Sequence, residues 1–254
     1  MELSGRTVIV TGSSGGIGRA LAVEFGRAGA SVVCAARRAD RLEETARLVE
    51  QAGGGALPLP TDITRPDQVE RMVAQTLERF GRIDVLFNNA GSFAAIAGLW
   101  EADPALWWQD VTVNLCGAFL CARAVLPHMM ERDEGIIINM DGGRPTGGSG
   151  YACGKAGLME LSKVLIAELE KVGSRVIVLN AGPGLVRTEM TEPQAATEAG
   201  RRWIPSTKET FEAGGTNRPE DIARAAVRMV ALATPELTGF YFNPDTNFEA
   251  LGNA

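Results

Sequence analysis

Tyr151 and Lys155 are the two residues of this sequence whose types and spacing best suit proton transfer. A separation of four residues places both side chains on one face of a helix. A free tyrosine has a pKa of about 10, which makes it a weak acid–base catalyst at neutral pH, but a neighbouring ammonium group lowers that pKa. The pair therefore predicts a tyrosine acid–base group supported by a lysine. The alternative is an ordinary Tyr–Lys pair on the surface.

The segment TGSSGGIG at 11–18 follows an apolar run and precedes a helical pattern. Gly12 permits a tight turn, Gly16 lets a ligand approach the backbone, and Gly18 allows close packing of helix and strand. The N-terminus of the following helix offers free N–H groups and the positive end of its dipole to an anion. The segment therefore predicts a binding site for the pyrophosphate of a dinucleotide.

The sequence CAARRAD at 34–40 indicates which dinucleotide binds. In NAD sites of this kind, an acidic residue about 20 residues beyond the glycines binds the ribose 2′-hydroxyl. Ala36 stands near that place, and Arg37 and Arg38 follow it. Guanidinium groups pair well with phosphate oxygens, so the pattern favours NADP(H) over NAD(H), with Arg37 preferred to Arg38 as the contact. The alternative is that both arginines are solvated residues at a helix start.

Apolar strand patterns alternate with helical patterns along the chain. Strands are predicted at 6–12, 31–36, 56–60, 83–89, 135–140, 175–180 and 239–243, and helices at 16–29, 38–52, 66–80, 104–131, 151–172 and 219–233. Alternation with nearly continuous apolar strands predicts a parallel sheet covered on both faces. The predicted fold class is α/β, a single-domain, Rossmann-type, doubly wound sheet spanning 1–254.

Five motifs make the sequence similar to the short-chain dehydrogenase/reductase family. They are TGxxxGIG at 11–18, NNAG at 88–91, Asn114, YxxxK at 151–155 and PG at 183–184, in the family's order over nearly the whole chain. The resemblance implies a Rossmann-type fold with seven strands and a nicotinamide cofactor. It also implies a homodimer or homotetramer assembled through the helices at 104–131 and 151–172.

The resemblance also assigns roles to single residues. Tyr151 becomes the acid–base group, Lys155 also holds the nicotinamide ribose, and Asn114 supports a water relay. Asp62 is expected near the adenine amine, or alternatively as a cap of the helix that begins at 66. The residues expected to contact the cofactor are Gly12, Ser14, Gly16, Ile17, Gly18, Arg37, Arg38, Asp62, Ile63, Asn89, Ala90, Gly91, Tyr151, Lys155, Pro183, Gly184 and Thr188.

One expected part of such a site is missing. Relatives carry a serine at the end of the fifth strand that donates a hydrogen bond to the substrate oxygen, whereas this chain reads DGG at 141–143 in a shortened loop. Gly142 has no side chain to donate, and Gly142→Ser is expected to raise the turnover of a ketone if the oxygen site is merely incomplete. Ser149 is predicted as a catalytic substitute, with Thr146 as a second option. An N-cap is the alternative role of Ser149.

An ionised Asp141 would disfavour an oxyanion and would raise the pKa of Tyr151 by charge repulsion. The same carboxylate suits a substrate that is cationic at this point, such as an amine or iminium. The sequence therefore leaves the chemistry of the reacting group open.

Composition excludes several classes of protein. The 254 residues carry a net charge of −6 and no dense block of lysine and arginine, which argues against nucleic-acid and anionic-membrane surfaces. No uncharged apolar run of 18 residues and no basic leader occur, so a cytoplasmic protein without a spanning helix is expected. With four cysteines outside CxxC spacing and one histidine, free thiols and no metal site are expected.

Together these features predict an NADPH-dependent oxidoreductase that reduces a carbonyl group, or oxidises the matching alcohol, on a small to medium apolar substrate. The aperiodic segment 187–216 is expected to supply an apolar lid with Met190, Trp203, Ile204 and Phe211, joined by Phe93. Two alternatives remain. One is a catalytically impaired NADP(H)-binding scaffold or regulatory subunit, and the other is a reductase of imine- or amine-type substrates.

Overall fold

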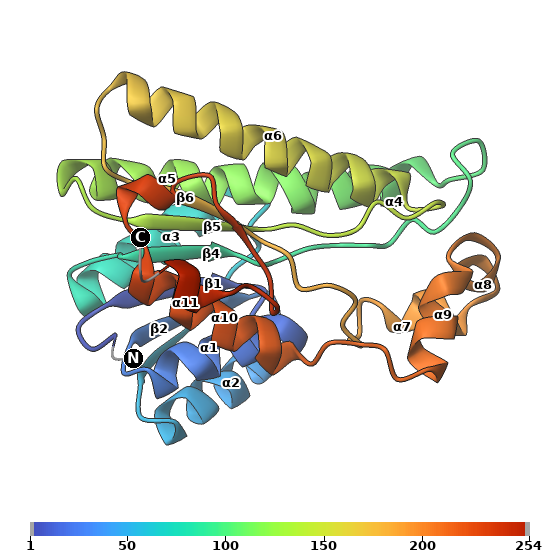
Figure 1. Cartoon of the computed structure of the whole chain (residues 1–254), viewed down its shortest axis with the longest axis horizontal. Helices are drawn as coiled ribbons and strands as arrows, with labels where there is room; N and C mark the ends of the chain where they lie inside the picture. Colours follow the sequence, from blue (N-terminus) through green and yellow to red (C-terminus); the bar gives the residue numbers. More distant parts are fainter. Residues whose placement is uncertain (1–2, 252–254) are drawn as a thin grey trace.

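A parallel β-sheet forms the centre of the computed structural model, which describes residues 3–251 (Figure 1). Its strands are β1 (Thr7–Thr11), β2 (Ser31–Ala36), β3 (Gly55–Pro60), β4 (Val85–Asn88), β5 (Ile136–Met140), β6 (Ile177–Ala181) and β7 (Tyr241–Phe242). Their order in the seven-stranded sheet is β3-β2-β1-β4-β5-β6-β7. The order reverses between β1 and β4, and such a reversal opens a ligand crevice at the carboxyl ends of the strands.

Helices cover both faces of the sheet (Figure 1). One face carries α1 (Gly16–Arg27), α2 (Ala39–Gln51) and α10 (Pro219–Leu232). The other carries α3 (Pro66–Phe80), α4 (Pro104–Val111), the π-helical turn η1 (Thr112–Gly117), α5 (Ala118–Glu131) and α6 (Ser149–Lys171). The shorter elements are α7 (Glu192–Ala196), α8 (Glu198–Trp203), α9 (Pro205–Glu212), the 3-10 turn η2 (Pro235–Leu237) and α11 (Phe248–Leu251).

Successive residues of each central strand supply two separate cores. Val8 and Val10 of β1 pack with Phe25 of α1, whereas Ile9, between them, packs with Met72 of α3 on the other face. Strands that are buried on both faces require an almost continuous apolar sequence, which is the pattern the sequence shows. The doubly wound, Rossmann-type fold class predicted from the sequence is confirmed.

The segment 187–216, which sequence periodicity left unassigned, contains three short helices, α7, α8 and α9. They lie beside the sheet, beyond the carboxyl ends of the strands (Figure 1, orange). Helices of five to eight residues complete too few turns to produce a recognisable periodic pattern.

One helical run meets the length and composition of a membrane-spanning segment. It covers Pro104–Glu131 and has a mean hydropathy of 1.3 over an 18-residue window, of which 39% is buried. The prediction that no helix could span a membrane therefore does not hold on these two criteria, because it required a run without charges and this helix includes Asp110 and Arg123. Within the fold the run packs against α6 and α3. A cytoplasmic location stays a prediction.

Candidate active site

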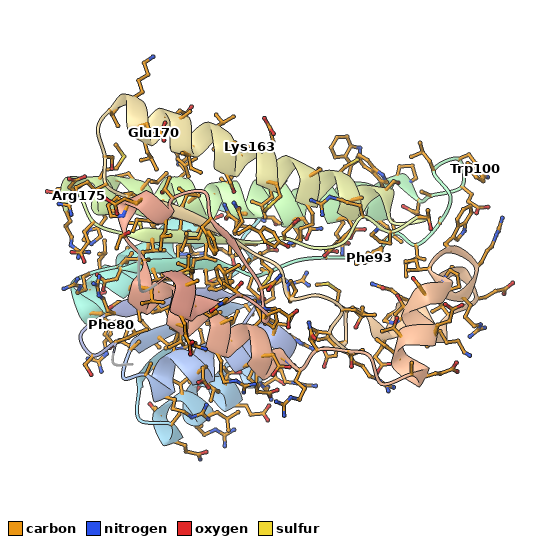
Figure 2. All side chains as sticks on the ribbon, in the orientation of Figure 1. Phe80, Phe93, Trp100, Lys163, Glu170 and Arg175 are labelled. Carbon is orange, nitrogen blue, oxygen red and sulfur yellow. The ribbon has the colours of Figure 1, made fainter. Side chains whose placement is uncertain are left out.

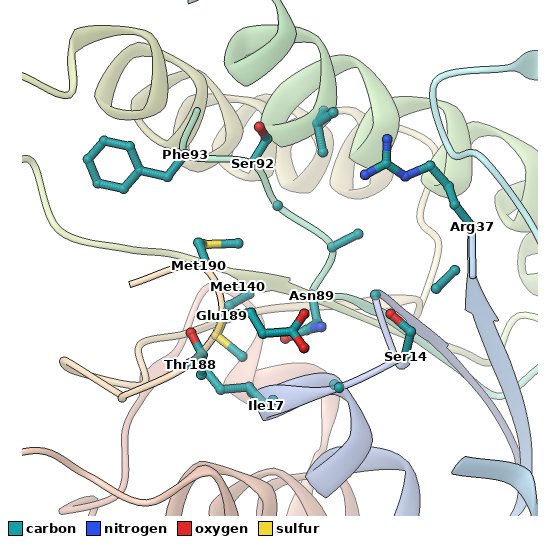
Figure 3. A pocket seen from close by; sticks show the side chains of 18 of the residues that line it. Ser14, Ile17, Arg37, Asn89, Ser92, Phe93, Met140, Thr188, Glu189 and Met190 are labelled. Atoms are coloured by element: carbon teal, nitrogen blue, oxygen red, sulfur yellow. The ribbon is translucent and has the colours of Figure 1, made fainter. Parts of the chain in front are cut away.

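A cavity of about 740 Å³ lies at the carboxyl ends of the strands, and Figure 3 shows its interior. The cavity is lined by the loops after β1, β2, β3, β4 and β6, by the end of β5 and by one face of α6. The glycine loop and the arginines after β2 lie along the same cavity as Tyr151 and Lys155. The fold thus joins the predicted dinucleotide site to the predicted proton-transfer pair.

Backbone crowding explains the glycines of the first loop. A β-carbon on Gly12 would lie 2.8 Å from Ala90 Cα, and one on Gly18 would overlap the Gly12 carbonyl oxygen. Gly12 and Gly16 have φ angles of 72° and 52°, a region that favours glycine. Because α1 begins at Gly16, its free N–H groups face the cavity end where the loop lies. This cradle fits the pyrophosphate of a dinucleotide.

Three arginines line the cavity beyond this loop, namely Arg37, Arg38 and Arg41. Arg37 forms no hydrogen bond or ion pair with any residue between 3 and 251, so its guanidinium is available to a ligand. Burial would raise the pKa of nearby Asp62, but hydrogen bonds from Thr64 and the charge of Arg37 hold it below its usual value.

Asp62 accepts hydrogen bonds from the Thr64 backbone nitrogen at 3.0 Å and from Thr64 Oγ1 at 2.7 Å. The N-cap of α3 is Arg65, so the alternative role of Asp62 as the cap of this helix is wrong. Asp62 stabilises a turn instead and lines the cavity.

Tyr151 and Lys155 lie on α6 at the other end of the cavity. The Tyr151 ring stacks on Phe93, with centroids 4.6 Å apart and planes inclined by 10°. Lys155 Nζ donates a hydrogen bond to the Met140 carbonyl oxygen at 2.7 Å and lies 5.9 Å from the centroid of the Tyr151 ring. The two side chains thus face the same space, as the spacing predicted.

The protonation behaviour of the pair departs from the sequence expectation. Burial raises the pKa of Tyr151 to about 12, and the negative charge of Asp141 adds to the increase. Complete burial lowers the pKa of Lys155 to about 8. The expected net lowering of the Tyr151 pKa toward neutrality is wrong for this structure, because desolvation of the phenolate outweighs any stabilisation by the ammonium group. The expected repulsion from Asp141 is confirmed in direction.

Gly142 lies directly against Tyr151. A β-carbon on Gly142 would overlap the Tyr151 hydroxyl oxygen and lie 2.8 Å from Cζ. A serine at position 142 would therefore require the phenol to move. The effect of Gly142→Ser on ketone turnover stays a prediction, and this contact argues against it. Asp141, the preceding residue, lines the cavity and forms an ion pair of 2.9 Å with Arg144, which the sequence analysis did not foresee.

Ser149 and Thr146 lie outside the lining of the cavity. Ser149 Oγ accepts a hydrogen bond from Trp107 Nε1 at 3.0 Å, and Thr146 Oγ1 donates one to the Trp203 carbonyl oxygen at 2.6 Å. The N-cap position of α6 is Gly148. Neither the catalytic role nor the N-cap role predicted for Ser149 agrees with this geometry, because its hydroxyl supports Trp107 instead.

Gly184 is the one expected cofactor contact outside the lining of the cavity, and Asn114, expected to support a water relay, also lies outside it. Asn114 is 1% exposed in η1, where its Nδ2 donates to the carbonyl oxygens of Ser92 and Asp110 at 2.7 and 2.8 Å. It lies behind Gly91, close enough that a β-carbon there would be 2.9 Å from Asn114 Oδ1. Its part in a water relay stays a prediction.

Only part of the expected lid faces the cavity. Met190 and Phe93 line it. Trp203 instead packs on Gly147 and on Trp100, with ring centroids 5.6 Å apart, and Phe211 contacts the Arg187 guanidinium at 5.0 Å. Ile204 is buried outside the cavity. Phe93 and Trp100 both lie on the side of the molecule nearest α8 (Figure 2).

A glycine loop, a parallel sheet with a crevice at its strand order reversal and a buried Tyr–Lys pair define an oxidoreductase of the Rossmann type. The chain belongs to the short-chain dehydrogenase/reductase family, because residues 6–199 match the short chain dehydrogenase family. Members of this family act on alcohol- or carbonyl-type substrates with a nicotinamide cofactor.

Individual relatives agree with this assignment. The chain is 31% identical over 248 residues to the 3-oxoacyl-[acyl-carrier-protein] reductase FabG of Thermotoga maritima, covering 94% of this chain and 96% of that protein. It is 39% identical over 201 residues, or 77% of its own length, to a short chain dehydrogenase of Pseudocercospora fijiensis and spans only 64% of that protein. A metagenomic short-chain oxidoreductase in complex with NADP has a similar structure, with a TM-score of 0.76, 29% identity and coverage of 96% and 99% of the two chains.

Proposed function

We propose that this protein is an NADPH-dependent reductase of carbonyl groups, or in reverse a dehydrogenase of the matching alcohols. One observation carries the proposal: a single cavity joins a dinucleotide cradle, with Arg37 in its lining, to the buried Tyr151–Lys155 pair. The similarity to a 3-oxoacyl reductase and to an oxidoreductase in complex with NADP supports the substrate class and the cofactor.

The residues present fit a nicotinamide dinucleotide and divide the work between them. Gly12, Gly16 and the first turn of α1 would bind the pyrophosphate. The 2′-phosphate would be bound by Arg37, with Arg38 and Arg41 beside it in the cavity lining. The bound nicotinamide supplies or accepts the hydride. Tyr151 is a neutral phenol at physiological pH, because its pKa is about 12, and so enters a reduction as the proton donor to the substrate oxygen.

Lys155 is a buried side chain that supports proton transfer by Tyr151. Its Nζ is fixed by the Met140 carbonyl oxygen at 2.7 Å, on the floor of the cavity beside Tyr151. A positive charge at this place stabilises negative charge that develops on the phenol oxygen when its proton leaves. The same ammonium group would hold the ribose hydroxyl groups of the cofactor with the two hydrogen atoms that do not bind Met140.

The walls of the reacting end favour an apolar substrate. Phe93, Met140 and Met190 line the cavity there, and methionine side chains adapt to irregular apolar shapes. These walls suit a ring or an acyl chain better than a sugar phosphate.

A second candidate function is the reduction of imines. Asp141 lines the cavity together with Tyr151, and the residue that follows it, Gly142, has no side chain. A carboxylate favours a cationic iminium over an oxyanion. Arg144 neutralises part of this charge through the 2.9 Å ion pair, so the ketone remains the preferred substrate of the proposal.

A homodimer or homotetramer is the proposed assembly. Leu106, Trp108, Phe119 and Val164 are exposed on α4, α5 and α6, where the resemblance places the contact between subunits. Large exposed apolar side chains on these helices support a contact between subunits here.

The test is a titration of the protein with NADPH and NADH, followed by a screen of ketones, aldehydes and imines with NADPH consumption as the readout. NADPH is expected to bind more tightly, and Arg37→Ala should weaken NADPH binding by about 1.5–3 kcal/mol. Arg47→Ala, a substitution on the outer side of α2, is the matched control. Equal affinities for both cofactors would contradict the cofactor assignment. NADPH binding without turnover of any carbonyl or imine would favour the scaffold.

A further inference from the structure

Glu189 places a carboxylate inside the cofactor cavity, next to the arginines. It follows β6 in the connection to α7, and Figure 3 shows its side chain extending across the cavity from the Thr188 side toward Ser14. Its Oε2 accepts a hydrogen bond from Arg38 Nη1 at 2.9 Å, and its Oε1 lies 3.7 Å from Arg41 Nη1. The Arg38 guanidinium also donates to Ser14 Oγ of the glycine loop at 3.3 Å. One acidic residue thus links the β6–α7 connection to the β2–α2 turn.

The backbone around Glu189 is held in place by short contacts. Thr191 Oγ1 accepts a hydrogen bond from the Thr188 nitrogen at 2.9 Å and donates one to the Val186 carbonyl oxygen at 2.7 Å. The Thr188 methyl group lies over the glycine loop, where a β-carbon on Gly16 would be 3.2 Å from it. The carboxylate therefore reaches Arg38 from a fixed turn that rests on the pyrophosphate-binding loop.

The ion pairs themselves are easily displaced. Side chains of Arg38 and Glu189 are 47% and 66% exposed, and exposed ion pairs contribute little to stability. A phosphate group carries up to two negative charges and three acceptor oxygens, so it competes effectively with one carboxylate for the same guanidinium groups. A ribose 2′-hydroxyl carries no charge and does not compete.

We propose that Glu189 is a specificity-determining residue that occupies Arg38 and Arg41 until the 2′-phosphate of the cofactor displaces it. The proposal rests on the proposed function, since it assumes that these arginines face the 2′-position. A phosphorylated cofactor removes the contact between Glu189 and the β2–α2 turn, whereas an unphosphorylated one leaves it in place. Glu189 therefore lowers the affinity for NADP(H) and leaves the affinity for NAD(H) unchanged. It thereby reduces the difference between the two affinities.

The test uses two fragments that lack the nicotinamide end, adenosine 2′,5′-bisphosphate and 5′-AMP, titrated calorimetrically into the full-length protein. Glu189→Gln should bind the bisphosphate about three- to fivefold more tightly, the size of one or two exposed ion pairs, and 5′-AMP unchanged. The gain should shrink at high salt, because these charges are exposed to solvent.

Glu192→Gln is the matched control. Glu192 lies three residues further along the same segment and pairs with Arg187 at 2.6 Å instead of with Arg38 or Arg41. Glu192→Gln should leave the affinities for both fragments unchanged if contact with the arginines matters. If only net charge matters, it should raise the bisphosphate affinity as much as Glu189→Gln does, and that result would overturn the proposal. In an Arg38→Ala background, Glu189→Gln should lose most of its effect.

The outcomes separate this proposal from the proposed function. An unchanged bisphosphate affinity in Glu189→Gln, with the unaltered protein still preferring the bisphosphate to 5′-AMP, would overturn the role of Glu189 and leave the NADPH preference standing. A second outcome is that the unaltered protein binds both fragments equally while Glu189→Gln binds the bisphosphate more tightly. That result would support the role of Glu189 as a competitor of the 2′-phosphate and contradict the proposed preference for NADPH. Weaker 5′-AMP binding in Glu189→Gln would overturn the proposal by showing that the carboxylate binds the ribose.

Discussion

The hydroxyl group of Tyr151 fills the space that a side chain on Gly142 would need. A hydroxyl-bearing residue at 142 and the phenol in its present place are therefore mutually exclusive. The glycine at 142 is thus coupled to the position of the tyrosine, which follows nine residues later at the start of α6. Asp141, the residue before Gly142, forms an ion pair of 2.9 Å with Arg144.

Gly142→Ala should therefore impair the protein by displacing Tyr151. We expect turnover with NADPH to fall at least tenfold, because the acid–base group loses its position, while NADPH binding changes little. Gly143→Ala is the matched control, since the nearest atom to a β-carbon there is Pro145 Cδ at 4.0 Å. Steady-state kinetics of both variants decide the point, and an unimpaired Gly142→Ala protein would refute the steric coupling.

Buried Lys155 predicts a pH dependence of stability. Its pKa is about 8 in the folded chain, below the usual lysine pKa of 10.5, so the folded state releases the proton first. The free energy of unfolding therefore rises with pH between these values. Lys155→Met lacks this gain. From pH 7 to 9.5 the unaltered protein should gain about 2 kcal/mol relative to the variant in denaturant-induced unfolding. Tyr151 is present in both proteins, so its own titration largely cancels in this comparison. If the free energy of unfolding changed with pH in the same way in the unaltered protein and in Lys155→Met, Lys155 would not be desolvated in the folded chain.

The regular elements were largely predictable from the sequence. The strand at 31–36 and the helix at 66–80 were predicted with their observed bounds, because an apolar strand between turn signals and a proline at a helix start are local features. The cavity also gathers most of the expected cofactor contacts, since the glycine loop and the carboxyl ends of parallel strands fix that edge of the sheet.

Contacts between distant residues were not predictable in this way. Ser149 turns toward Trp107, which is 42 positions away, and Glu189 reaches Arg38 over 151 positions. Burial decides the pKa of Tyr151, and it depends on Phe93 stacking from the loop after β4. Arg41 follows Arg38 by three residues in the sequence RRADR. This spacing could have indicated that Arg41 also lines the cavity, as it does.

The outer surface of α6 provides a test of the assembly. Val164 is 47% exposed on this helix, next to Lys163, which Figure 2 labels on α6. Val164→Glu should shift the protein toward monomers in sedimentation velocity, because it places a charge in the proposed contact. Val172→Glu, just beyond the end of α6, serves as the control. A monomeric unaltered protein would rule out the assembly, and an unaffected Val164→Glu oligomer would place the contact elsewhere.

The central claim is that Tyr151 transfers the proton, and Tyr151→Phe tests it most directly. Tyr241→Phe is the matched control, since the chain contains only two tyrosines and Tyr241 lies on β7 outside the cavity lining. With a ketone identified in the screen, NADPH consumption should fall by a factor of about 10² or more in Tyr151→Phe, the contribution typical of a positioned acid. NADPH binding should be unchanged, and Tyr241→Phe should keep its activity. A Tyr151→Phe protein that consumes NADPH at the rate of the unaltered protein would contradict the account.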